Sequence, residues 1–109
     1  MFNVVSGPGL HLENVFNYPN PFTASTIFTF EHTQVSSIDV EIKIYTVAGR
    51  CIQTVKQSNV SDRYVRIAWD GLDKEGDPLA NGVYLYKVIA KTQDGRFTSE
   101  TLGKLSILK

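Results

Sequence analysis

The segment of residues 69–91, WDGLDKEGDPLANGVYLYKVIAK, constrains the fold of this chain more than any other. Its first part is a loop in which Asp-Gly, Gly-Asp-Pro and Asn-Gly steps supply the backbone conformations that tight turns need. Residues 83–90 then form a predicted strand with apolar side chains on both faces. Such a strand lies in the middle of a sheet or is covered on both sides, so the rest of the chain is expected to pack around it.

Alternation of apolar and polar residues predicts the other strands. Residues 38–47 show it most clearly, and an Ala-Gly step separates them from residues 50–56, which we interpret as the second arm of a hairpin. Residues 57–61 are polar and are predicted to form a loop. Further strands are expected at residues 11–16, 27–31, 63–69 and 97–108. Gly103 marks a point at which the last strand is expected to break or bulge.

Residues 18–22, YPNPF, predict a rigid corner, because two prolines fix φ and cannot donate to a sheet. Tyr18 and Phe22 at its ends are expected to clamp the start of the fold. The chain thus has about seven short strands, regular turn signals and no segment of helical period. We predict an all-β fold, a seven-stranded antiparallel immunoglobulin-like β-sandwich without the paired cysteines of antibody domains.

Length and charge indicate one domain with no general affinity for anionic partners. The 109 residues include 11 Lys plus Arg and 11 Asp plus Glu, a balance that argues against a nucleic-acid or membrane surface. No apolar run approaches the roughly 18 residues of a transmembrane helix, and the first residues do not form a signal peptide. We interpret residues 1–10 as a linker or a non-native remnant and residues 11–109 as the domain.

Acidic residues cluster in the loop of residues 70–82 and are weak candidates for a calcium site. Closely spaced carboxylates can supply several of the six to eight oxygens that calcium needs. The spacing does not match the EF-hand loop, however, and Lys74 lies among the acids. Acids that form turns and face water are therefore the preferred interpretation. The calcium candidates are Asp70, Asp73, Glu75 and Asp77.

No pattern of catalytic residues is recognisable in the sequence. There is no nucleophile elbow and no phosphate-binding Gly loop. His11 and His32 are far apart and lack the spacing of zinc ligands. Cys51 is the one cysteine and is expected to be a buried, inert thiol. We therefore expect a non-enzymatic domain that needs no cofactor.

Aromatic residues are expected to build the core. This applies to Trp69, Tyr84, Tyr86 and Phe97, because large side chains at alternating strand positions are typical of sandwich cores. A small carbohydrate-binding sandwich is a further alternative and would need exposed, coplanar aromatic rings. The candidates for such rings are Tyr45, Tyr64 and Phe97.

Five stretches, in this order, carry a resemblance to a known family: residues 18–22 (YPNPF), 44–50 (IYTVAGR), 69–71 (WDG), 81–84 (NGVY) and 104–109 (KLSILK). Together they resemble the C-terminal sorting domain of Bacteroidetes type IX secretion over residues 15–109. YPNPF and the pair WDG and NGVY also occur in the related flagellar hook-scaffold immunoglobulin-like domain, and KLSILK favours the sorting domain. Within the sorting family, the chain is most similar to the C-terminal domain of the gingipain-like sortase of that system.

The resemblance implies a non-catalytic secretion signal. Its partners would be the outer-membrane translocon and the shuttle protein that receives cargo, and its parent would be a C25-type cysteine protease exported to the cell surface. No clear cargo cleavage site precedes the domain, which is consistent with a domain that is retained. The recognition elements of the family fall on Asn81, Gly82, Val83, Tyr84, Lys104, Leu105 and Lys109.

A different class of function remains as the alternative: an immunoglobulin-like structural spacer or adhesion module that packs against a neighbouring domain. The terminal strand separates the two, since edge strands are either protected or used for pairing. A spacer is expected to tolerate extension past Lys109, whereas a sorting strand is not.

Overall fold

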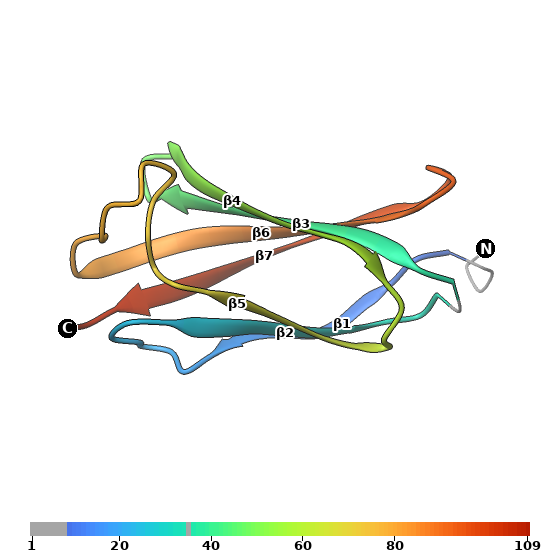
Figure 1. Cartoon of the computed structure of the whole chain (residues 1–109), viewed down its shortest axis with the longest axis horizontal. Coiled ribbons are helices and arrows are strands. Elements are labelled where there is room, and N and C mark those ends of the chain that lie inside the picture. Colours follow the sequence, from blue (N-terminus) through green and yellow to red (C-terminus); the bar gives the residue numbers. More distant parts are fainter. Residues whose placement is uncertain (1–8, 35) are drawn as a thin grey trace.

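The computed structural model describes residues 9–34 and 36–109, which form two antiparallel sheets packed face to face (Figure 1). The three-stranded sheet has the order β1-β2-β5 and the four-stranded sheet the order β4-β3-β6-β7. Their strands are β1 (Leu12–Tyr18), β2 (Thr26–His32), β3 (Ile38–Thr46), β4 (Cys51–Val60), β5 (Tyr64–Trp69), β6 (Gly82–Thr92) and β7 (Thr98–Ile107). This confirms the predicted all-β sandwich of seven antiparallel strands, and no helix in the described ranges could span a membrane.

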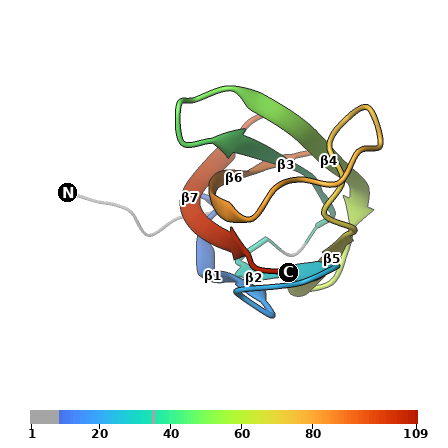
Figure 2. The same cartoon turned by 90° about the vertical axis from the view of Figure 1, so that its left-hand side faces the viewer.

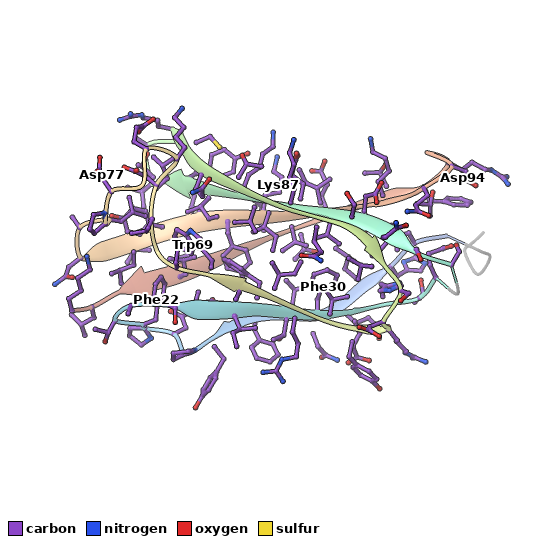
Figure 3. The ribbon with its side chains drawn as sticks, in the orientation of Figure 1. Phe22, Phe30, Trp69, Asp77, Lys87 and Asp94 are labelled. Carbon is purple, nitrogen blue, oxygen red and sulfur yellow. The ribbon has the colours of Figure 1, made fainter. Side chains whose placement is uncertain are left out.

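Alternating side chains on the facing sides of the sheets form the core. The inward side chains of β3 are at most 3% exposed and face the aromatic rings of the other sheet; they are Ile38, Val40, Ile42 and Ile44. The Phe28 ring lies 4.9 Å from the Tyr86 ring and 6.2 Å from the Trp69 ring, measured between centroids. Figure 3 shows Trp69 and Phe30 between the two layers, while Lys87 points away from them. The predicted aromatic core is thus confirmed for Trp69 and Tyr86, whereas Tyr84 and Phe97 are half-buried.

β6 is the internal strand that its sequence predicts, because it pairs with β3 on one side and with β7 on the other. Its inward residues Tyr86, Val88 and Ala90 are buried. The opposite face is only partly covered, since Leu85 and Ile89 are half-buried and Val83 is 47% exposed. The apolar side chains on that face therefore belong to the outer surface of the sheet.

The loop predicted for residues 57–61 is wrong, because β4 continues to Val60 and pairs with β3 at Gln57 and again at Val60. Gln57, Ser58 and Asn59 are exposed, and β4 lies at the edge of its sheet. An exposed edge accepts polar side chains on both faces, so polarity alone did not indicate a loop there. The irregularity falls instead at a bulge opposite residues 38–40, where Asn59 has φ of 58°.

The break predicted at Gly103 is also wrong, since β7 pairs with β6 from Thr98 to Ile107 without interruption. Gly103 faces Tyr86 across the two strands. The tyrosine ring occupies the space that a side chain at position 103 would fill. The missing side chain is thus replaced by a neighbouring ring, which keeps the strand regular.

The start of the domain is fixed by one residue that the sequence assigned to the linker. Leu10 is only 6% exposed and belongs to the core cluster. Nearby, the Thr33 hydroxyl donates to the Gly9 carbonyl, and the His11 N–H donates to the same hydroxyl. Packing therefore begins at least one residue before the predicted boundary, and the rest of the linker prediction concerns residues 1–8, which lie outside the described ranges.

Candidate interaction site at the β6–β7 end

The residues that the resemblance singles out lie together at one end of the sandwich. Gly82, Val83 and Tyr84 pair with Ile107, Ser106 and Leu105 respectively, so the start of β6 lies beside the end of β7. In Figure 1 this is the left-hand end, where the chain terminates next to the loop that enters β6. The two stretches, more than twenty residues apart in the sequence, thus form one structural unit.

Hydrogen bonds tie the last residue to the loop before β6. The Lys109 N–H donates to Asn81 Oδ1 at 3.0 Å, and Lys109 Nζ donates to the Leu79 carbonyl at 2.7 Å. The Tyr84 hydroxyl closes the same loop by donating to the Ala80 carbonyl at 2.7 Å. The structural role of these side chains is therefore to hold the loop before β6 against the last residue; they are Lys109, Asn81 and Tyr84.

Exposure divides the predicted recognition residues into two groups. Leu105 is fully buried in the core, so its side chain is not available to a partner while the domain is folded. The side chains of Lys104, Val83 and Lys109 are exposed, as is Asn81. These four are the residues through which a partner could read the folded end.

The YPNPF corner lies against the outer edge of β7, an arrangement that sequence reasoning missed. The Phe22 N–H donates to the Ser106 carbonyl and its carbonyl accepts from the Leu108 N–H, both at 3.0 Å. Asn20 Oδ1 accepts from the Ser106 N–H at 2.9 Å, and its Nδ2 donates to the Lys104 carbonyl at 3.2 Å. The sequence feature that indicates this arrangement is an Asn between two prolines. Because neither proline has an N–H group, the Asn side chain makes the hydrogen bonds to β7 at this point.

The predicted clamp by two aromatics is half right. Phe22 is 2% exposed and its ring meets the Trp69 ring edge-on with centroids 5.7 Å apart. Tyr18 is 71% exposed and points to solvent. The reason is strand alternation, since Tyr18 ends β1 on the outer face of the three-stranded sheet. Figure 2 shows that β7, at the edge of its sheet, lies beside β1 of the other sheet.

A cavity of about 270 Å³ opens between the corner, the loop after Trp69 and the last residue. Phe22, Asp70, Gly71, Pro78 and Lys109 line it with four neighbours. Gly71 has φ of +74°, and a side chain there would approach the Ala24 carbonyl oxygen to 3.1 Å. Glycine is therefore needed for the loop to lie this close to the corner.

The acidic loop does not assemble as the calcium prediction required. Asp73 Oδ1 accepts from the N–H groups of Glu75 and Asp77, and Asp70 Oδ1 accepts from Leu72 N–H. These are bonds of turns. Across residues 9–34 and 36–109, no three His, Cys, Asp or Glu side chains come close enough together to hold a metal ion. Asp77 lies at the surface of the same loop (Figure 3).

The aromatic residues proposed for a carbohydrate platform do not share one surface. Tyr45 belongs to β3, Tyr64 to β5 in the other sheet, and Phe97 precedes β7 in the hairpin at the far end. The exposed rings instead gather on the outer face of the three-stranded sheet. They are Phe16, Tyr18 and Tyr64, with exposed fractions of 51%, 71% and 66%.

The remaining titratable side chains, His32, Cys51 and Tyr86, are buried or half-buried and make structural contacts. His32 is 1% exposed, with Nε2 2.8 Å from the Asp62 carbonyl and Nδ1 accepting from the Gln34 N–H. Cys51 is half-buried rather than buried as expected, and its Sγ lies 3.6 Å from the Gln53 carbonyl oxygen. Burial raises the pKa of the Tyr86 hydroxyl. None of these groups lies beside a second catalytic candidate in the way that a nucleophile and its base do.

Comparison with known proteins agrees with this architecture. The family model described as "FlgD Ig-like domain" matches residues 17–94, which is most of the chain. No match was found among curated proteins.

Two solved structures are similar to the chain. One is dimeric latent PorU from Porphyromonas gingivalis, with a TM-score of 0.80 and 26% identity over 98% of this chain. The other is FlgD from Xanthomonas campestris, with a TM-score of 0.61 and 20% identity over 91% of this chain, a level that shows a shared fold. The match spans 10% of the PorU chain and 67% of the FlgD chain.

Proposed function

We propose, from the premise that the chain belongs to the FlgD Ig-like domain family, that this member is a non-catalytic sorting domain of type IX secretion. Its partners are the outer-membrane translocon and the shuttle protein that receives cargo. The protein that carries it is then exported through the periplasm to the cell surface. Likeness to a part of PorU supports this choice over a flagellar role, as does the terminal KLSILK.

One observation carries the proposal: the side chains of four of the seven residues that the resemblance implicates are exposed together at one end of the sandwich. Asn81, Val83, Lys104 and Lys109 come from two stretches of the chain and lie around the paired ends of β6 and β7. A receptor could contact all four without unfolding the domain. Exposed lysine ammonium groups on a rigid surface give specificity through complementary charges on a partner.

A reporter fusion tests the proposal. Residues 9–109 are joined to the C-terminus of a periplasmic fluorescent protein in a type IX-competent Bacteroidetes strain and in a twin without the translocon. Surface display only in the competent strain is expected, and the mass of the displayed reporter shows whether the domain is retained. Retention in the periplasm of both strains, with the domain folded, would contradict sorting.

A matched pair of variants localises recognition. Lys104→Glu changes a charge at the proposed end, and Lys91→Glu makes the same change on the outer face of the same sheet, near its other end. Both lysines are exposed, so neither change is expected to unfold the domain. Display is expected to fall for Lys104→Glu alone. Equal display of the two variants argues against recognition at this end.

A second candidate, a module that packs against a neighbouring domain, is favoured by the exposed rings of Phe16, Tyr18 and Tyr64. Aromatic side chains are enriched at the buried centres of interfaces. Next to Phe16, the Thr29 hydroxyl is covered and has no hydrogen-bond partner among the described residues. Amide exchange of the domain alone and within its natural polypeptide distinguishes the candidates: slower exchange confined to β1, β2 and β5 supports packing, and equal rates contradict it.

A further inference from the structure

The outer edge of β7 is covered along only half of its length. The covered part is residues 104–108, where Asn20 and Phe22 bond to the outward carbonyl and N–H groups. In an antiparallel strand the backbone groups of alternate residues point to the same side. Since both groups of Ser106 point away from β6, those of Leu102 and Glu100 do so as well.

In the first half of this edge the outward backbone groups are unpaired among the described residues. Within the described ranges, the outward N–H and C=O groups of Glu100 and Leu102 meet no backbone partner. The stretch contains no proline, its pairing with β6 has no bulge, and Leu102 is 69% exposed. Bulges, prolines and covering loops are the usual protections of an edge. Here the covering loop is confined to the second half. In the first half the edge carries the charged side chains of Glu100 and Lys104, and β1 of the other sheet lies near β7 without pairing with it.

This part of the edge carries an ordered set of side chains. Glu100, Leu102 and Lys104 lie on the same outer face of the sheet, because alternate residues of a strand share a face. They present an acid, an apolar side chain and a base in that order. An added antiparallel strand would place its residues directly opposite these three, where side chains interact most strongly.

We propose that residues 100–104 are a strand-addition site for an extended segment of a partner protein. The complementary segment runs antiparallel and reads acidic, apolar, basic at alternate positions, so that it meets Lys104, Leu102 and Glu100 in turn. Main-chain hydrogen bonds supply affinity, and the three side-chain pairs supply direction and register. This goes beyond the sorting proposal and holds equally for a packing module.

A second copy of the same strand carries the same pattern but is blocked. Pairing two copies about Leu102 would bring Thr98 of one opposite Ser106 of the other. That position is already occupied, because Asn20 and Phe22 bond to both backbone groups of Ser106. A short segment can leave the edge before it reaches the corner, whereas β7 of a second copy continues into its hairpin. The corner thus selects a partner strand with a free end.

The test uses a capped heptapeptide, Thr-Glu-Thr-Val-Thr-Lys-Thr, and its charge-swapped counterpart with Lys and Glu exchanged. NMR amide exchange and shift titration are followed on the domain, whose described residues form a hydrophobic core cluster. The amides of Glu100, Leu102 and Lys104 are expected to exchange quickly without peptide and slowly with the first peptide. The counterpart is expected to bind about tenfold more weakly, because two cross-strand charge pairs become repulsive. No slowing at millimolar peptide overturns the proposal.

Two variants complete the experiment. The exchange Glu100→Lys with Lys104→Glu reverses the charges and is expected to invert the preference between the two peptides. Leu102→Pro removes the outward N–H without removing a bond to β6, and is expected to abolish binding of both. Equal affinities for both peptides in the charge-reversed protein would refute the assigned register. Concentration-dependent dimerisation that protects Leu102 without peptide would overturn the proposal in favour of pairing between copies.

Discussion

The ring of Tyr86 lies over the α-carbon of Gly103, its direct partner across β6 and β7. A Cβ atom built on Gly103 would lie 2.4 Å from Tyr86 Cζ, far inside van der Waals contact. The ring is 2% exposed and also packs against Phe28. Glycine and tyrosine at these positions therefore form one packing unit that links β7 to the centre of the core.

Gly103→Ala is expected to destabilise the domain by about 1–3 kcal/mol, because the new methyl group must displace a buried ring. Urea denaturation measures the change. The same substitution in a Tyr86→Leu background serves as the control, since the smaller side chain leaves room for the methyl group. An equal cost in both backgrounds would show that the ring contact is not responsible.

Asn20→Ala is expected to loosen the corner from β7. Three hydrogen bonds are lost, at the Ser106 N–H, the Lys104 carbonyl and Asn17 Oδ1, and the free energy of unfolding is expected to fall by about 1–3 kcal/mol. The Ser106 amide should exchange faster with solvent. Thr23→Val removes only a weak 3.4 Å bond to the Leu108 carbonyl and is the matched control. Unchanged exchange at Ser106 in Asn20→Ala would contradict the interlock, the pair of hydrogen bonds between the Asn20 side chain and β7.

His32→Phe is expected to cost about 1–3 kcal/mol, because the ring partners of the Asp62 carbonyl and the Gln34 N–H are removed at a buried position. Thermal or urea unfolding measures the loss. His11→Phe is the control, since His11 is exposed and only its backbone N–H is bonded. Similar losses in the two variants would mean that the buried ring bonds contribute little.

Asp94 is expected to make the stability of the β6–β7 turn depend on pH. Hydrogen bonds from the Arg96 N–H and the Thr92 hydroxyl lower the pKa of its carboxyl group. A lowered pKa means that the stabilisation is present above the pKa of the unfolded chain and is lost as the pH falls through the folded value. Figure 3 places Asp94 at the exposed tip of the hairpin.

NMR titration of the Asp94 carboxyl group and amide exchange in residues 92–97 check this dependence. Asp94→Asn keeps an acceptor oxygen but cannot titrate. The difference between the two proteins in turn protection is therefore expected at neutral pH and should vanish in acid. A difference that persists below the titration of Asp94 would contradict the assignment.

Sequence reasoning succeeded where one strand carries its own signal. The alternation of β3 identifies its buried row, and the two apolar faces of residues 83–90 place β6 inside a sheet. It failed where the local structure depends on neighbouring strands and side chains. Residues 57–60 form a strand because an edge tolerates polar side chains, and Gly103 stays regular because a ring from β6 covers it. Neither cause can be seen in a local window of sequence.

For the candidate site, too, one part could be predicted from local sequence and another part could not. That the segment entering β6 and the end of β7 lie together follows from a hairpin whose turn at Asp94-Gly95 the sequence indicates. The contribution of Asn20 could not be predicted, since its partners lie up to 86 residues away. Likewise, the burial of Leu105 and the exposure of Lys104 depend on the register of β7, which a shift by one residue would invert.

The interlock between Asn20 and Ser106 has a consequence for the order of events during folding. It closes a loop of 86 residues, so its entropic cost is met only when the intervening strands are already in place. A nascent chain therefore exposes the corner from an early moment but cannot seat it until β7 has emerged from the ribosome. Folding of the domain is thereby deferred until its last strand has been synthesised, and a chain interrupted before residue 104 is left with an incomplete core and is a ready substrate for proteases.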